Sequence, residues 1–197
     1  MKRLPAARAA LLYAGLAAFA NPAAAQVLDA DGRAGIEALK AGEMRKLVVH
    51  SEPAAVEQVA FTAKDGTERL LADSDGKVRL VNFWATWCAP CRVEKPSLDA
   101  LQREMGGADF EVIAIATGRN DPAGIERFNE EVGVTELATN LDPKSAVARA
   151  MNVPGLPVTV VLNREGQEIA RLMGGADWDS ESARAIISTL VATGDAP

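Results

Sequence analysis

Two apolar runs separated by a helical pattern form the centre of the chain. The runs Leu80–Ala85 and Phe110–Ala116 are mostly apolar, which is typical of strands buried on both faces. Between them, Leu98 and Leu101 follow the helical period in a segment expected to be a helix from Cys88 to Met105. A strand, a helix and a second strand in this order predict a parallel pair joined by a right-handed crossover.

Two hairpins and a final helix flank this unit. Each predicted hairpin joins two short strands across a turn that contains glycine, Gly66 in the first and Gly166 in the second. A last helix is expected over Asp179–Ala192, where apolar residues recur at helical spacing. The predicted hairpin strands are Val59–Thr62 with Glu68–Ala72, and Val158–Leu162 with Glu168–Met173.

The segment between the second buried strand and the second hairpin predicts one more helix and strand. Asp121 is a good N-cap and Pro122 a good first residue, so a helix is expected to begin there and continue through Val132. A short strand is expected over Leu137–Leu141 and a short helix over Pro143–Met151. This segment either extends the core or shapes a groove for a partner, and the sequence leaves both open.

The start of the chain has the order of a secretory signal peptide. Lys2, Arg3 and Arg8 precede the apolar stretch Ala9–Ala20, and Ala23–Ala25 offers a small-residue cleavage site. A membrane anchor is the alternative, although the apolar stretch is short for a span of about 20 residues. The expected parts are a signal peptide or anchor over 1–25, an N-terminal extension over 26–56 and one domain over 57–197.

The net charge and the number of cysteine and histidine residues argue against a nucleic-acid partner and against a metal site. Loss of residues 1–25 takes away three basic residues and no acidic one, so the formal net charge moves from −6 to −9. An acidic protein attracts nucleic acid poorly, and no nucleic-acid partner is expected. The chain has two cysteines and one histidine, His50, whereas a zinc site needs about four ligands. We therefore expect no metal.

Both cysteines stand at the start of the central helix. Cys88 directly follows the buried strand and its turn, so unpaired amide groups and partial positive charge there stabilise a thiolate. Cys88 is the predicted nucleophile. Cys91 lies on the same side of the helix within reach of a disulfide and is the predicted resolving thiol, while Pro90 stiffens the first turn. A disulfide closing so short a loop constrains the unfolded chain little, which favours redox chemistry over a stabilising role.

These residues also resemble a known family. The resemblance is carried by Val81-Asn82-Phe83-Trp84-Ala85-Thr86-Trp87-Cys88-Ala89-Pro90-Cys91, followed by Arg92, Glu94 and Pro96, and it is to the TlpA/ResA-like branch of thioredoxin-fold proteins. It covers residues 57–192 and implies an α/β thioredoxin-like fold, with a central mixed β-sheet flanked by helices, an N-terminal β-hairpin and a central helix-strand insertion. It also implies a thiol-disulfide oxidoreductase that needs no dissociable cofactor.

The resemblance assigns the surroundings of the disulfide as well. The segment Gly155–Val158 is similar to the loop whose proline is in cis and faces the disulfide, so the bond before Pro157 is expected to be cis. An extended partner segment could pair with the backbone near Leu156. Trp84 and Trp178 are expected to pack in the core. The residues expected to contact substrate are Trp87, Ala89, Pro90, Leu156 and Pro157.

Glu94 is the third candidate catalytic residue. Cys88, Cys91 and Glu94 are spaced three apart on one helix, so each neighbours the next. Thioredoxins carry a buried aspartate at the strand position held here by Asn82, and an amide cannot take a proton. The resemblance therefore implies that Glu94 is partly buried, has a raised pKa and relays a proton to or from Cys91. From the residues alone, an exposed glutamate favoured by the helix dipole is the simpler alternative.

The resemblance implies a periplasmic protein that reduces the cysteines of other exported proteins. The implied partners are apocytochrome c or copper-delivery proteins for cytochrome oxidase, with a membrane thiol reductase as electron donor, and we expect a monomer. Two alternatives are a disulfide-forming oxidase and a copper-binding chaperone that uses Cys88 and Cys91. Against them, Ala89-Pro90 lacks the histidine of strong oxidants, and no histidine follows His50 as it does in Sco-type copper-delivery proteins.

Overall fold

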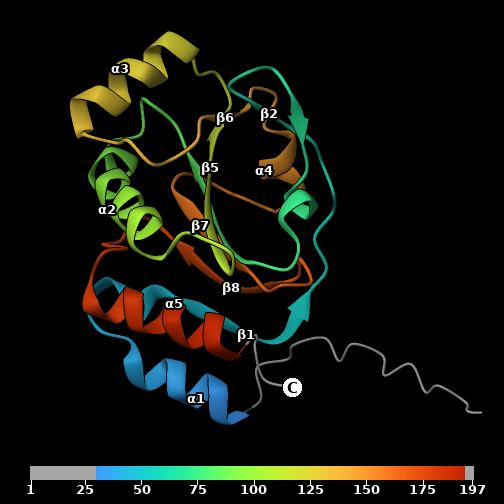
Figure 1. Ribbon diagram of the computed structural model, residues 1–197, viewed down its shortest axis with the longest axis vertical. Coiled ribbons are helices and arrows are strands. Elements are labelled where there is room, and N and C mark those ends of the chain that lie inside the picture. Colours follow the sequence, from blue (N-terminus) through green and yellow to red (C-terminus); the bar gives the residue numbers. More distant parts are fainter. Residues whose placement is uncertain (1–29, 194–197) are drawn as a thin grey trace, which may run out of the picture.

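Eight strands form one mixed sheet that runs through the middle of the molecule (Figure 1). The computed structural model describes residues 30–193. The sheet has the strand order β1-β8-β7-β4-β5-β6-β2-β3, in which β4 is parallel to β5 and antiparallel to β7. The predicted parallel pair and mixed sheet are thereby confirmed. The strands are β1 (Val48–Ala54), β2 (Phe61–Ala63), β3 (Glu68–Arg69), β4 (Val78–Trp84), β5 (Phe110–Thr117), β6 (Asn140–Asp142), β7 (Val158–Leu162) and β8 (Glu168–Met173).

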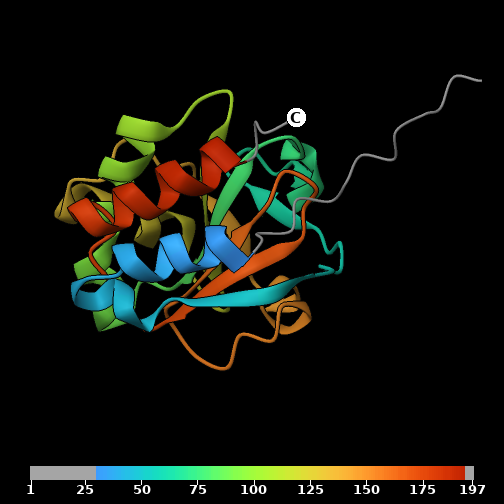
Figure 2. The same cartoon turned by 90° about the horizontal axis from the view of Figure 1, so that it is seen from below.

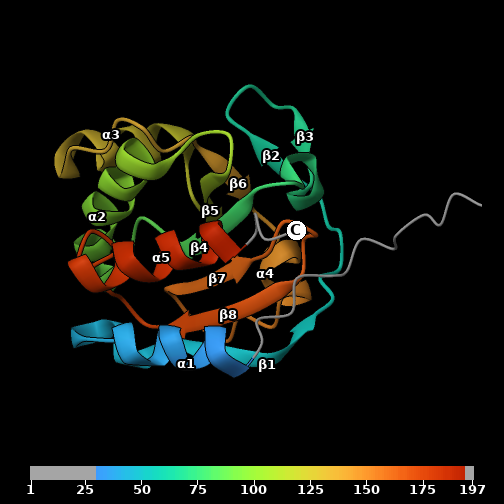
Figure 3. The same cartoon turned by 60° about the horizontal axis from the view of Figure 1, so that its bottom comes forward.

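Helices cover both faces of this sheet. Helices α1, α2, α3 and α5 share one apolar core with one face, whereas α4 and the 3-10 helix η2 pack against the other face. Figures 2 and 3 show α1 and α5 lying side by side over the edge formed by β1 and β8. The helices are α1 (Ala30–Leu39), α2 (Ala89–Met105), α3 (Pro122–Val132), α4 (Ala146–Ala150) and α5 (Glu181–Thr193), with 3-10 helices η1 (Gly42–Lys46) and η2 (Leu71–Ser74).

Strand β4 leads into the turn that precedes the two cysteines. All its residues are buried, as the apolar run predicts, because consecutive side chains enter opposite cores. Leu80 and Trp84 join the core under α2 and α5, while Val81 and Phe83 join the core under α4. The strand ends at Trp84, four residues before the first cysteine, so packing of its two faces fixes the start of α2.

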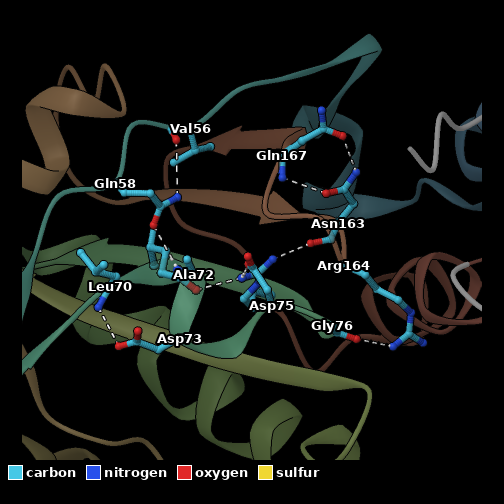
Figure 4. Close-up of polar contacts among 12 residues, drawn as sticks. Val56, Gln58, Leu70, Ala72, Asp73, Asp75, Gly76, Asn163, Arg164 and Gln167 are labelled. Carbon is cyan, nitrogen blue, oxygen red and sulfur yellow. Dashed lines mark hydrogen bonds and ion pairs between the residues drawn. The ribbon is translucent and has the colours of Figure 1, made fainter. Parts of the chain in front are cut away.

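A network of polar contacts holds the opposite end of β4 (Figure 4). The Arg79 guanidinium is fully buried, forms an ion pair with Asp75, and donates to the backbone oxygen of Asn163 over 2.7 Å. Arg164 donates to the backbone oxygen of Gly76 over 2.7 Å, which ties the β7–β8 turn to the segment that precedes β4. These contacts therefore help to fix the register of β4 against β7 at this end of the strand.

The first hairpin is present but shorter than predicted. Strands β2 and β3 pair antiparallel across the expected turn, where Gly66 has a φ of 87°. The prediction of strand over Leu70–Ala72 is wrong, because the side chain of Asp73 accepts from the Leu70 N–H over 2.8 Å and turns the chain into η2 (Figure 4). A local side-chain bond thus replaces the ladder hydrogen bond of a strand.

The N-terminal extension joins the same sheet. Strand β1 pairs antiparallel with β8, and α1 packs against α5. The proposed boundary between residues 56 and 57 stays a prediction, as does the signal peptide or anchor over 1–25, which lies outside the described residues. Within residues 30–193, no helix is both long and apolar enough to span a membrane.

Candidate active site

The two cysteines form a disulfide at the N-terminus of α2. Cys88 is the N-cap residue, and its Sγ accepts from the Cys91 N–H over 3.3 Å. The Cα atoms lie 5.3 Å apart, and Cys88 is 5% exposed whereas Cys91 is 0% exposed. Cys88 is therefore the outer sulfur, at the positive end of the helix, and Cys91 the inner one. This is the arrangement that the assignment of nucleophile and resolving thiol requires.

The turn before Cys88 is held by a residue that the sequence interpretation missed. Asn120 accepts with its Oδ1 from both the Thr86 N–H, over 2.9 Å, and the Thr86 hydroxyl, over 3.1 Å. Its Nδ2 donates to the backbone oxygen of Thr117 at the end of β5 over 3.0 Å. Because Asn120 lies 34 residues after Thr86, only the pairing of β4 with β5 brings them together, and no local sequence signal points to it.

Glu94 lies behind the disulfide and is 2% exposed. Its Oε1 accepts from Asn82 Nδ2 over 2.9 Å, and its Oε2 accepts from the Ala176 N–H over 3.2 Å. The same Asn82 nitrogen lies 3.0 Å from the hydroxyl oxygen of Thr159 on β7. The strand position at which thioredoxins carry an aspartate thus contacts the helix glutamate directly, while the alternative of an exposed Glu94 is wrong.

Burial decides the charge of this carboxyl group. Loss of hydration raises the pKa of Glu94 from 4.5 to about 7, against the hydrogen bonds from Asn82 and Ala176 and the attraction of Lys95, which lower it. A carboxyl group with a pKa near neutral pH can both accept and release a proton under ordinary conditions. The geometry therefore gives Glu94 the means to act as an acid or a base.

A cleft of about 470 Å³ gives access to the Glu94 side of α2. Its walls include Pro90, Val93 and Glu94 from α2 and Gly175 and Ala176 from the segment before α5. A side chain at Gly175 would stand 3.4 Å from the backbone oxygen of Pro90 and 3.8 Å from Glu94 Oε2. Glycine at this position keeps the cleft open beside the carboxyl group.

The residues expected to contact substrate lie at the end of the sheet where α2 begins. The bond between Leu156 and Pro157 is cis, as expected, and Val158 pairs with Phe83 of β4, which places the loop at the end of the sheet where α2 begins. Trp87 is 68% exposed, and Ala89 and Pro90 are also exposed. The other two tryptophans, Trp84 and Trp178, are buried as predicted.

Helix α2 also buries two charged residues that the sequence interpretation did not single out, Lys95 and Asp99. Asp99 Oδ1 accepts from three consecutive N–H groups, those of Thr135, Glu136 and Leu137, over 2.8–3.1 Å. A signal for both residues existed, since they stand one turn apart beside Leu98 on the apolar side of a helix. Within residues 30–193, no group of three or more histidine, cysteine or carboxylate side chains is placed to hold a metal ion.

Comparison with known proteins agrees with this geometry. The model of the Redoxin family matches residues 50–187. The chain belongs to the Redoxin family. The chain is 34% identical over 112 residues to the thiol:disulfide interchange protein HelX of Rhodobacter capsulatus, covering 55% of this chain and 61% of HelX. It is 33% identical over 115 residues to the thiol-disulfide oxidoreductase ResA of Geobacillus kaustophilus, covering 58% and 64%.

These alignments span less than two thirds of the length of either relative. Among solved structures, the Redoxin-family chain is similar to a secreted thiol-disulfide isomerase from Corynebacterium glutamicum, with a TM-score of 0.64 and 18% identity, covering 80% of this chain and 96% of that one. At this identity the likeness shows the fold alone. The thioredoxin-like fold and the TlpA/ResA-like resemblance are confirmed.

Proposed function

We propose that this Redoxin-family protein is a thiol-disulfide oxidoreductase that reduces disulfides in other proteins. The observation that carries the proposal is the Cys88–Cys91 disulfide at the N-terminus of α2, with the buried carboxyl group of Glu94 one turn behind it. The helix end favours a thiolate on the outer sulfur, and the carboxyl group offers a proton acceptor for the inner one.

In the first step, the reduced protein attacks a partner disulfide. The Cys88 thiolate bonds to one partner sulfur, the partner S–S bond breaks, and the other partner sulfur leaves as a thiolate that takes a proton from water. Because Cys88 is the more exposed sulfur and Trp87 and Pro90 are exposed around it, the partner can approach without unfolding α2.

In the second step, Cys91 resolves the mixed disulfide. The Cys91 thiol gives its proton to Glu94, and the resulting thiolate bonds to the Cys88 sulfur. The S–S bond between Cys88 and the partner breaks, and the partner sulfur leaves as a thiolate that takes a proton from water. Two electrons have then passed from the protein to its partner, and the Cys88–Cys91 disulfide has formed. Glu94 passes its proton to solvent through the cleft that it lines with Pro90 and Val93.

The proposal also covers the location of the protein, its substrates and its electron donor. The basic, apolar and small-residue pattern of residues 1–25 supports export, and the names of the relatives HelX and ResA describe thiol-disulfide exchange. We propose a periplasmic location, apocytochrome c or copper-delivery proteins as substrates, and a membrane thiol reductase that returns the disulfide to the dithiol.

The reduction potential tests the direction of electron flow. The protein is equilibrated against graded thiol buffers and followed by tryptophan fluorescence, because Trp84 and Trp87 flank the turn that leads to the disulfide. A value between about −270 mV and about −200 mV supports a reductant. A value near about −120 mV would show an oxidant and overturn the proposal. The proton role is tested separately by titrating the Cys91 thiol in Glu94→Gln, where an unchanged pKa would refute it.

A further inference from the structure

The buried side of α2 carries a row of ionisable groups behind the resolving thiol. Cys91, Glu94, Lys95 and Asp99 are each at most 2% exposed. Glu94 and Lys95 stand three and four residues after Cys91, and Asp99 stands four after Lys95, so Glu94 and Lys95 each lie about one helical turn from Cys91, and Asp99 lies one turn beyond Lys95. One thiol, two carboxyl groups and one amine are therefore buried within two turns of the same helix.

Lys95 is the unusual member of this row. Its Nζ lies 3.8 Å from the centre of the Trp84 ring and has no hydrogen-bond partner among residues 30–193. The ring centres of Trp84 and of Phe128 on α3 lie 4.9 Å apart. The central carbon of the Arg92 guanidinium lies 4.6 Å from the centre of the Phe128 ring. Two cations from α2 thus stand over an aromatic pair, which fixes the position of the lysine side chain. A buried amine without hydrogen bonds is costly, so stability does not explain it.

The charges that face Lys95 come mainly from its own helix. Glu94 and Asp99 both attract the Lys95 ammonium group. Asp99 is further occupied by the N–H groups of the loop after α3, among them that of Glu136, and Arg103 lies 3.9 Å from it.

On the α3 side, Glu131 forms an ion pair with Arg92 at 2.9 Å. Trp84, the β4 residue packed against the lysine, carries no charge. Glu94 is therefore the ionisable group through which the charge on Lys95 can affect proton transfer at Cys91.

We propose that Lys95 is a positioning residue for thiol-disulfide exchange, whose positive charge controls the ionisation of Glu94 and hence the pH range in which Cys91 can pass on its proton. The proposal rests on the proton role given to Glu94 in the proposed function. A cation buried one turn below Cys91 stabilises negative charge on either the carboxylate or the thiolate while the proton moves between them. Lys95 takes no part in bond making.

The electrostatics of the two side chains agree with this geometry. Burial lowers the pKa of Lys95 from 10.5 to about 7, against the attraction of Glu94 and Asp99, which raises it. Burial raises the pKa of Glu94 to about 7, and the attraction of Lys95 opposes that rise. Both groups thus change charge near neutral pH, and the charge of one affects the other.

The test compares Lys95→Met, which keeps an unbranched side chain one atom shorter and removes its charge, with Lys64→Met, which removes the same charge from the exposed ion pair with Glu126. Glu94 is titrated by NMR of carboxyl-labelled glutamate in the full-length oxidised protein. The reduced protein is reacted with glutathione disulfide from pH 5 to pH 9. An opposite charge nearby commonly moves a carboxyl pKa by about one unit or more. We expect the Glu94 midpoint and the rate profile of Lys95→Met to rise together by about one unit, which makes exchange up to about tenfold slower at pH 6 and equal at pH 9.

The control and the outcomes separate this inference from the proposed function. Lys64→Met is expected to leave both the midpoint and the profile unchanged. An unchanged Glu94 midpoint in Lys95→Met overturns the inference, even if Glu94→Gln alters the rate profile. A rate profile that Glu94→Gln leaves at wild type overturns the proton role of Glu94, and the inference with it. If Lys95→Met does not fold, Lys95→Gln provides a second uncharged side chain of similar length for the same measurements.

Discussion

The buried carboxyl group of Glu94 makes a quantitative prediction about stability and pH. In the folded, oxidised protein its pKa is about 7, compared with 4.5 for an ordinary glutamate. Between these values the folded protein binds a proton that the unfolded chain has released, so the free energy of unfolding falls as pH rises through this window. A difference of about 2.5 pH units corresponds to about 3 kcal/mol, fully lost above the folded pKa.

Glu94→Gln removes this titration, because a glutamine keeps the shape of the side chain and carries no ionisable proton. The free energy of unfolding is measured by guanidinium denaturation of the oxidised protein at intervals from pH 4.5 to pH 8, followed by the fluorescence of buried Trp84 and Trp178. Relative to wild type, the variant is expected to gain about 3 kcal/mol between the ends of this range. Glu57→Gln, at an exposed glutamate, is the control and should show a constant difference. A constant difference for Glu94→Gln would refute the argument.

Three further substitutions test the resolving thiol, the turn before Cys88 and the buried lysine. Cys91→Ser should stop turnover and accumulate a mixed disulfide on Cys88, visible on a non-reducing gel, whereas no covalent complex would contradict the assignment of the resolving thiol. Asn120→Ala removes two hydrogen bonds to Thr86 and should lower the free energy of unfolding by about 2 kcal/mol in denaturant titrations; no loss would show that the turn is held elsewhere. Lys95→Met should raise the free energy of unfolding by up to about 5 kcal/mol at pH 6 and by much less at pH 10, because the folded protein lacks the lysine proton between its pKa of about 7 and the ordinary 10.5. An equal gain at both pH values would contradict the lowered pKa of Lys95.

The fold could be predicted from the sequence where local patterns are strong. The apolar run of β4, the helical period after Cys88 and the capping pair Asp121 and Pro122 all fixed elements that the structure contains. The interpretation failed at Leu70, where the side chain of Asp73 ends the hairpin through one hydrogen bond. A pattern of apolar residues does not show which polar side chain will compete for a backbone group.

The site was predictable along α2 and much less so across the sheet. The helical spacing placed Cys91 and Glu94 on one side, and both are buried there. Asn120 and Thr159 come from other elements, and the pairing of strands brings them to the site. The helical period predicts that Lys95 lies on the buried side of the helix. Its contact with the aromatic ring of Trp84, in contrast, could not be predicted from that period.

The insertion formed by α3 and the segment after it supports the helix that carries the cysteines. Phe128 packs on Trp84, and Asp99 binds the three N–H groups that begin at Thr135. The cleft beside Glu94 is lined by η1, α2 and the segment before α5, with no residue of the insertion in its walls. Of the two roles left open by the sequence, extension of the core is therefore the one that these contacts support. Through Phe128 on the ring that covers Lys95 and through the three N–H groups on Asp99, the insertion helps to bury the charged residues on this side of α2, and burial lowers the pKa of Lys95.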